Sequence, residues 1–200
     1  MSWIEIVPRE RAAARLRSLY DRVAGPDGRV DSILRVHGLR PHTLEGHVTL
    51  YKAVLHHTAN TLPDWLLETL GVHVSRLNRC GYCVDHHFAG LNRLVGDADA
   101  NAILAVIDSG VEAPPVDGRA MAAIRYATRL THDPGAIREP DVVRLREAGF
   151  DDGEILEMNQ VVSYFAYANR TVLGLGVDTR GDALGLSPGN TNDPADWSHA

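Results

Sequence analysis

Apolar residues recur every three or four positions along most of this 200-residue chain. The stretch "PRERAAARLRSLYDRVAG" is typical, because it places Ala12, Leu16, Leu19 and Val23 on one stripe. That period belongs to an amphipathic helix and not to a strand. No segment combines strand-like alternation with a hairpin turn. The chain is therefore predicted to be all-α, a multi-helix bundle of about eight helices.

We expect a single all-helical domain over residues 1–180 and an extended or loosely ordered arm over residues 181–200. Two hundred residues are enough for one full hydrophobic core. The last twenty, "GDALGLSPGNTNDPADWSHA", are rich in glycine, proline, asparagine and aspartate, which is typical of a segment without regular structure.

Composition excludes several classes of protein. The formal net charge of −6 argues against nucleic acid or an anionic membrane as a partner. No apolar run approaches the roughly 18 residues of a membrane span. The start, "MSWIEIVPRERAAARL", lacks the apolar core of a signal peptide, so a cytoplasmic location is expected. Two cysteines form no disulfide scaffold, and in a reducing compartment a close pair is typical of catalysis or metal binding.

Both cysteines lie in one stretch, "NRCGYCVDHHFAGL", at residues 78–91. Asn78 is a favourable N-cap residue, and a helix beginning there places Cys80 in its first turn. Free N–H groups and the helix dipole would then favour a thiolate at Cys80. At about 100° per residue, Cys80, Cys83 and His87 share one face of the helix. His86 points in a neighbouring direction and is predicted to be a surface or interface histidine.

A C-x-x-C pair at a helix start suits reversible dithiol–disulfide chemistry. In peroxide reduction, one thiolate attacks the O–O bond, a second thiol resolves the sulfenic acid, and an acid protonates the departing oxygen. His87 is placed to take a thiol proton. Glu68, in the apolar stretch "DWLLETLGV", is a buried acid that needs a reason, and it would orient the histidine if the two helices fold back on one another.

Glu68 followed by "VSRLNRCGYCVDHH" resembles the motif of the alkylhydroperoxidase D-like branch of the carboxymuconolactone decarboxylase family. In that motif a glutamate precedes C-x-x-C-x-x-x-H by twelve residues, as Glu68 precedes Cys80 here. The segments "AIRYATRLTHDP" and "LREAGFDDGEILEMNQVVSYFAYANR" also resemble peroxidase-related members. The resemblance extends over about residues 40–177, with the redox motif at 68–87.

The resemblance implies an all-helical fold that assembles as a homo-oligomer, either a dimer, a trimer or a hexamer. It also implies hydroperoxide reductase (antioxidant peroxidase) activity. By this analogy Cys83 forms the sulfenic acid, Cys80 is its resolving or proton-donating partner, and His87 and Glu68 form the proton relay. The helix argument favours Cys80 as the more acidic thiol, so the two interpretations differ on which sulfur attacks.

We expect no bound cofactor, since no haem, flavin or nicotinamide motif is present. The expected partners are a hydroperoxide substrate and a dithiol reductant protein of lipoyl or thioredoxin-like type.

One position departs from the antioxidant branch, in which a histidine stands between the cysteines. This chain has Tyr82 there, and a phenol with a pKa of about 10 is a poor base at neutral pH. Tyr82 is nevertheless a candidate catalytic residue, because its hydroxyl is able to donate a hydrogen bond to a peroxide oxygen.

Three other interpretations stay open. Decarboxylation of a muconolactone-type substrate is the wider family's other activity, although it needs no thiol pair. A metal site would use Cys80, Cys83 and His87 with His86 or His73, although structural zinc usually draws on two separated ligand pairs. A non-catalytic, metal-binding oligomeric protein is the third. Further along the chain, polar Asn169 is predicted to cap its helix or contact another subunit, and neighbouring aromatic residues are predicted to be core or interface: Tyr164, Phe165 and Tyr167.

Overall fold

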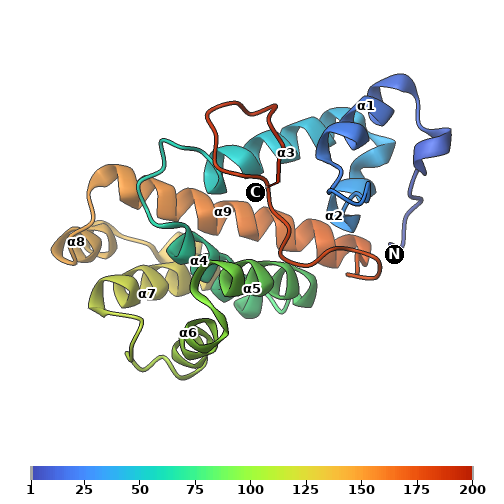
Figure 1. Ribbon diagram of the computed structural model, residues 1–200. Helices are drawn as coiled ribbons and strands as arrows, with labels where there is room; N and C mark the ends of the chain where they lie inside the picture. Colours follow the sequence, from blue (N-terminus) through green and yellow to red (C-terminus); the bar gives the residue numbers. More distant parts are fainter. Residues whose placement is uncertain (1, 200) are drawn as a thin grey trace.

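The computed structural model describes residues 2–199, and the all-α prediction is confirmed there, with nine α-helices (Figure 1). The α-helices are α1 (Ala14–Val23), α2 (Ser32–Arg35), α3 (Pro41–Leu55), α4 (Asp64–Leu77), α5 (Gly81–Val95), α6 (Asp97–Ser109), α7 (Gly118–His132), α8 (Glu139–Glu147) and α9 (Asp152–Leu175). Three short 3-10 helices lie at Arg9–Arg11, Val36–Leu39 and Pro134–Ala136. Within residues 2–199, no helix combines the length and the apolarity that a bilayer crossing requires.

The helix starts follow the local signals of the sequence. Asp117 caps α7 by accepting a hydrogen bond from the Ala120 N–H at 2.8 Å. Asp151 and Glu154 form a capping box at the start of α9, with reciprocal bonds of 2.8 and 3.0 Å. Such a box satisfies donors that would otherwise be left unpaired at a helix start. The 24-residue α9 is therefore a helix despite its valine, tyrosine and phenylalanine content.

Helix α4 is the central element of the bundle and packs against α5, α7 and α9. Every residue from 66 to 75 is buried, so this helix has no solvent-facing side in its middle. A helix of this kind must satisfy each of its polar side chains internally. Thr69 bonds its own helix at the Trp65 carbonyl, and His73 bonds the Thr128 hydroxyl of α7 at 2.7 Å. Of the remaining buried polar residues of α4, Glu68 contacts His87 and Ser75 accepts a hydrogen bond from Asn169.

The turn between α4 and α5 corrects one prediction. Asn78 is the C-cap of α4 and not the N-cap of the next helix, which begins at Gly81 with Cys80 at its N-cap. The N–H of Arg79 bonds the Arg76 carbonyl at 3.0 Å, and that of Cys80 bonds the Ser75 carbonyl at 2.8 Å. This is a Schellman motif. Arg79 occupies its left-handed position, with φ of 59°, where glycine is usual and gives the sequence signal.

The tight turn makes α4 and α5 an antiparallel hairpin, in which the two helices are side by side (Figure 1). A residue near the middle of α4 is thereby brought opposite one in the middle of α5. The fold-back that a Glu68–His87 contact requires is therefore present.

Gly71 lets α9 approach α4 closely. A Cβ atom at this position would lie 2.3 Å from Cζ of Phe165. The Phe165 ring in turn packs edge-on against the His87 imidazole, with 4.6 Å between ring centroids. The absence of a side chain at Gly71 thus allows the Phe165 ring to take the position in which it packs against His87.

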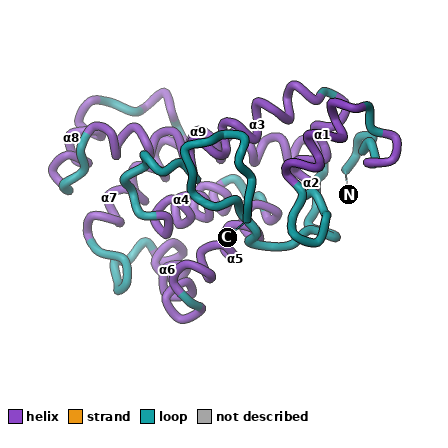
Figure 2. The backbone as a smooth tube through the Cα atoms, turned by 45° about the horizontal axis from the view of Figure 1, so that its top comes forward, coloured by secondary structure: helices purple, strands orange, loops and turns teal. Residues whose placement is uncertain are grey.

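The segment after α9, from Gly181 to His199, contains no helix and lies across the bundle between α3 and α5 (Figures 1 and 2). Arg93 of α5 donates to the carbonyls of Gly185 and Leu184, at 2.5 and 3.0 Å. Lys52 of α3, the only lysine in the sequence, is fully buried and donates to the Gly189 carbonyl. These contacts fasten the segment to both helices. Residues 1 and 200 lie outside the described part.

Replacing Gly71 with alanine should destabilise the fold by about 1–3 kcal/mol, because the added methyl group overlaps the Phe165 ring in a packed core. Gly46→Ala in α3 is the matched control, since a Cβ there meets no atom within 4 Å. The control should be neutral or more stable by up to about 1 kcal/mol. Urea unfolding of both variants measures the difference, and equal midpoints would contradict the close approach.

Candidate active site

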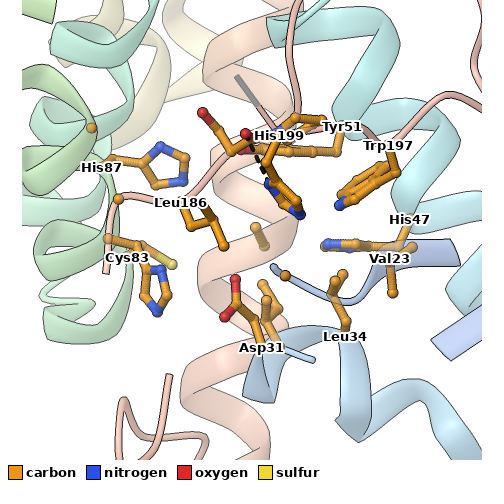
Figure 3. Close-up of a pocket in the computed structure, with 18 of the residues that line it drawn as sticks. Val23, Asp31, Leu34, His47, Tyr51, Cys83, His87, Leu186, Trp197 and His199 are labelled. Carbon is orange, nitrogen blue, oxygen red and sulfur yellow. Dashed lines mark hydrogen bonds between the residues drawn. The ribbon is translucent and has the colours of Figure 1, made fainter. Parts of the chain in front are cut away.

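A cavity of ≈ 70 Å³ lies between the α4–α5 hairpin, the α1–α3 layer and the C-terminal segment (Figure 3). By the same measure a single water needs about 10–15 Å³, so the cavity holds several waters or a small organic molecule. Figure 3 shows the Cys83 sulfur and the Asp31 carboxylate directed into this space, with His87 on the same wall as Cys83. The polar side chains that line it are Asp31, His47, Tyr51, Glu68, Tyr82, Cys83, His86, His87, Tyr164 and His199.

The two thiols are already close to bonding distance. Cys80 Sγ and Cys83 Sγ lie 3.2 Å apart and are unbonded. A disulfide requires about 2.05 Å between the sulfurs. Cys80 is 0% exposed, whereas Cys83 is 3% exposed and forms part of the cavity wall. Oxidation to a disulfide therefore needs only a small movement, and only Cys83 faces the space that a substrate would occupy.

Cys80 is the more acidic of the two thiols, whereas Cys83 is the one that lines the cavity. Its hydrogen bond with Cys83 lowers the pKa of Cys80, against the cost of burial. The same hydrogen bond, together with burial, raises the pKa of Cys83 well above its usual value. The first proton to leave the pair therefore comes from Cys80, and the Cys83 thiol then donates to that thiolate. This direction agrees with the argument that Cys80 is the more acidic, although Cys80 is not in the first helical turn.

A buried amide network from α9 supports the two sulfurs. Asn169 donates to the Ser75 hydroxyl at 3.1 Å and accepts from the Asn78 amide at 2.9 Å. After the larger effects, hydrogen bonding to Asn169 lowers the pKa of both Cys80 and Cys83. Asn169 is 1% exposed, so its predicted role in a subunit contact is wrong. Asn169 and Ser75 are about ninety positions apart in the chain, so no local sequence pattern could indicate this contact.

Glu68 and His87 form a buried pair beside the cavity. His87 Nδ1 lies 2.7 Å from Oε2 of Glu68, and both side chains are largely buried. Because a carboxylate only accepts hydrogen bonds, Nδ1 carries the proton and Nε2 is left as the basic nitrogen. The structure thus places Glu68, Cys83 and His87 around one cavity, with Cys80 behind Cys83, which are the four residues that the family resemblance implied for the site.

The prediction that His86 lies on the surface is wrong, because the residue is buried in the cavity wall. Its Nε2 lies 3.4 Å from Oδ2 of Asp182, in the C-terminal segment. Asp182 also accepts hydrogen bonds from the Ser32 N–H, the Ser32 hydroxyl and the Tyr82 hydroxyl, at 2.9, 2.7 and 2.7 Å. Burial works to raise the pKa of Asp182, but these partners outweigh it and lower the pKa below its ordinary value.

Asp31 is the second carboxylate on this side of the cavity. Burial raises its pKa to about 6, with neighbouring His86 acting in the opposite direction. Oxygen or nitrogen atoms of Asp31, His86 and Asp182 all lie within 4.8 Å of one another. An imidazole with two carboxylates at this spacing has the donor types of a divalent-cation site. The Cys80, Cys83, His87 and His73 set considered from the sequence does not assemble, because His73 faces Thr128 on α7.

Tyr82 is placed by two hydrogen bonds. Its hydroxyl donates to Asp182 at 2.7 Å and accepts from the Ile33 N–H at 3.1 Å. Burial, followed by the charge of Asp182, raises the pKa of Tyr82 well above its usual value. The phenol therefore stays protonated, and its proton is directed at the carboxylate.

The far wall of the cavity is aromatic. Tyr51, Tyr164 and Trp197 lie with ring centroids 5.6–5.7 Å apart around Tyr51. His47 packs against Tyr164, and burial, with His37 adding, lowers the pKa of His47 to about 3. The imidazole is therefore neutral at pH 7. Tyr164 thus belongs to the pocket wall as well as to the core.

The C-terminal segment closes the cavity. Gly185 has φ of +72° and passes so close to α5 that a Cβ there would lie 2.7 Å from the Ala89 carbonyl carbon. Leu186, Trp197 and His199 add to the lining. A second cavity of ≈ 300 Å³ lies beyond Glu68 under the same segment. Access to the sulfurs therefore depends on how tightly this segment is held.

Comparisons with known proteins identify the fold. No protein-family model and no curated protein matches the sequence. An uncharacterized peroxidase-related protein from Ralstonia eutropha, an alkylhydroperoxidase AhpD core, superposes with a TM-score of 0.77 at 21% identity, covering 90% of this chain and 93% of that one. A peroxidase-related protein from a Silicibacter species gives 0.78 at 22% identity, with the same coverage.

A variant of the debrominase Bmp8 in complex with 2,3,4-tribromopyrrole is also similar, with a TM-score of 0.71 at 15% identity over 90% of this chain and 95% of that one. At these identities the likeness shows the fold. It confirms, at that level, the predicted resemblance to alkylhydroperoxidase D-like, peroxidase-related proteins.

Gly185→Ala should speed alkylation of the native thiols by iodoacetamide by about tenfold or more, because strain of about 1–2 kcal/mol at positive φ adds to a clash with the α5 backbone. Gly181→Ala is the control, since its φ is also positive, +88°, but a Cβ meets nothing within 4 Å. Equal alkylation rates in the two variants would contradict a closing role for the contact at Gly185.

Proposed function

We propose that this chain is a thiol-dependent hydroperoxide reductase that cycles between a Cys80–Cys83 dithiol and a disulfide. The observation that carries the proposal is the pair of sulfurs 3.2 Å apart, with Cys83 on the wall of a cavity and a buried Glu68–His87 pair beside it. Likeness of fold to peroxidase-related proteins supports it.

In the proposed reaction Cys83 attacks, because it is the sulfur on the cavity wall. The Cys80 thiolate or His87 Nε2 takes the Cys83 proton. The Cys83 sulfur then bonds one peroxide oxygen, the O–O bond breaks, and an alcohol and a Cys83 sulfenic acid result. Cys80 displaces water from the sulfenic acid and forms the disulfide. The short distance between the sulfurs and the helix start at Cys80 both favour this second step.

A dithiol protein of lipoyl or thioredoxin-like type would return the disulfide to the dithiol. Because Cys80 is sealed, this reductant must reach Cys83 first, through an opening under the C-terminal segment. A cytoplasmic location and a homo-oligomeric assembly belong to the same proposal. In the proposed reaction Tyr82 acts through Asp182, because the Tyr82 hydroxyl donates its hydrogen bond to that carboxylate and not to the substrate.

A second candidate function is reductive dehalogenation of an aromatic ring, favoured by the aromatic wall of the cavity. Tyr51, Tyr164 and Trp197 suit a flat ring, and a debrominase shares the fold. The same dithiol would serve. The thiolate takes the halogen from the protonated ring, and the second thiolate releases halide as the disulfide forms, so that aryl bromide and two thiols give arene, disulfide and hydrogen bromide.

One equivalent of cumene hydroperoxide should remove both thiols of the reduced protein, because Cys80 resolves the Cys83 sulfenic acid. Thiol titration before and after the addition measures this. Cys80→Ser should instead accumulate a sulfenic acid that dimedone traps, whereas Cys83→Ser should keep its remaining thiol. Full retention of both thiols in the wild type would refute the peroxidase proposal, and stoichiometric zinc lost in Cys83→Ser would favour the metal-binding alternative.

If dehalogenation is the activity, the reduced protein should release one bromide from 2,3,4-tribromopyrrole for each disulfide formed. Ion chromatography of bromide, alongside the thiol count, measures the ratio. Cys83→Ser should release none. A protein that loses its thiols to hydroperoxide but releases no bromide would exclude this second function and leave the first.

A further inference from the structure

Reduction of an alkyl hydroperoxide creates a strongly basic alkoxide as its leaving group. A proton has to arrive as the O–O bond breaks, and a positioned acid typically contributes 10²–10⁴-fold to such a step. The Glu68–His87 pair and Cys80 account for the proton that leaves Cys83. They leave open which group supplies the proton to the departing oxygen.

A second imidazole–carboxylate pair contacts the same cavity. His86 and His87 are neighbours on α5, yet their carboxylate partners come from different parts of the chain: Asp182 in the C-terminal segment and Glu68 in α4. Both histidines line the cavity with Cys83. Asp31 lies across from the sulfur and points its carboxylate into the space (Figure 3).

The two aspartates differ in their environment. Asp182 is held as an anion by the Ser32 N–H and hydroxyl and by the Tyr82 hydroxyl. Asp31 is partly buried and faces that anion, and burial raises its pKa to about 6. Carboxylates whose surroundings separate their pKa values in this way take different roles, one fixed in charge and one able to carry a proton.

We propose that Asp31 is the acid that protonates the leaving oxygen, with His86 and Asp182 as positioning residues. This inference rests on the proposed hydroperoxide reductase function. Asp182 lies 3.4 Å from His86, and its negative charge adds to the burial that raises the pKa of Asp31 and so favours a proton on that carboxylate.

The step balances in protons and electrons. The Cys83 thiolate supplies an electron pair to one peroxide oxygen, and a sulfur–oxygen bond forms while the oxygen–oxygen bond breaks. Sulfur is oxidised by two electrons and the peroxide is reduced. The pair from the broken bond leaves on the alkoxide oxygen, which takes the Asp31 proton and departs as an alcohol. The proton released by Cys83 restores the acid through the cavity.

A resident cation is the competing use of the same three side chains. Asp182 already accepts three hydrogen bonds from protein donors, so most of its lone pairs are occupied. Tyr82 directs its proton, and not a lone pair, at this carboxylate. These donors suit an anion that remains in place better than a ligand to a metal.

The role of Asp31 as the acid is tested by comparing two oxidants whose leaving groups differ in basicity. Asp31→Asn should slow oxidation of Cys83 by cumene hydroperoxide about 100-fold, but by less than about threefold with peroxybenzoic acid, whose leaving carboxylate needs no proton. Stopped-flow measurement of thiol loss gives both rate constants. The unchanged peroxyacid rate shows at the same time that the variant is folded and that its thiol is reactive. Asp99→Asn, at an exposed aspartate on α6 that does not line the cavity, should leave both rates unchanged.

Equal losses with the two oxidants, or no loss with either, would overturn the role of Asp31. A wild-type rate that a chelator abolishes for both oxidants would assign the cluster to a cation and overturn it as well. If the wild type reacts with neither oxidant, the hydroperoxide reductase function itself fails, and the acid fails with it.

Discussion

The burial of every residue from 66 to 75, the middle of α4, is the constraint on which the site depends. A carboxylate in the middle of such a helix is costly unless a charged or hydrogen-bonding partner meets it. For Glu68 that partner is His87, 2.7 Å away across the α4–α5 hairpin. The tight turn at Arg79 sets the register of the hairpin, and Gly71 lets Phe165 pack against the imidazole. The same packing of α4, α5 and α9 that forms the core therefore also fixes the position of the His87 imidazole.

The cavity joins segments that are far apart in the chain. Asp31 precedes α2, the cysteines begin α5, Asn169 belongs to α9, and Asp182 follows it. A buried polar group left without a partner costs more than a hydrogen bond contributes, so the contacts of Asn169 and Asp182 with these distant segments stabilise the cavity wall. The result is a cavity lined by Cys83 and by the histidines of two imidazole–carboxylate contacts, Glu68–His87 and Asp182–His86.

The helical periodicity, the capping residues and the spacing from Glu68 to His87 could be read from the sequence, because each is a local pattern or a pattern between adjacent helices. The helix start near Asn78 could not, since a left-handed arginine replaced the glycine that normally marks such a turn. Asn169, Asp31 and Asp182 were missed for another reason. Their partners lie about 50 to 150 positions away, and nothing in a single sequence indicates that the C-terminal segment folds back over His86.

The fastening of that segment has a consequence for labelling chemistry. The only side-chain amine in the sequence, that of Lys52, is fully buried and bonded to the Gly189 carbonyl. Dyes, cross-linkers and acetyl donors that acylate amines therefore find no lysine side chain to modify while the segment covers Lys52. The amine becomes available only when the covering segment lifts, so it reports on opening independently of the redox state of either sulfur.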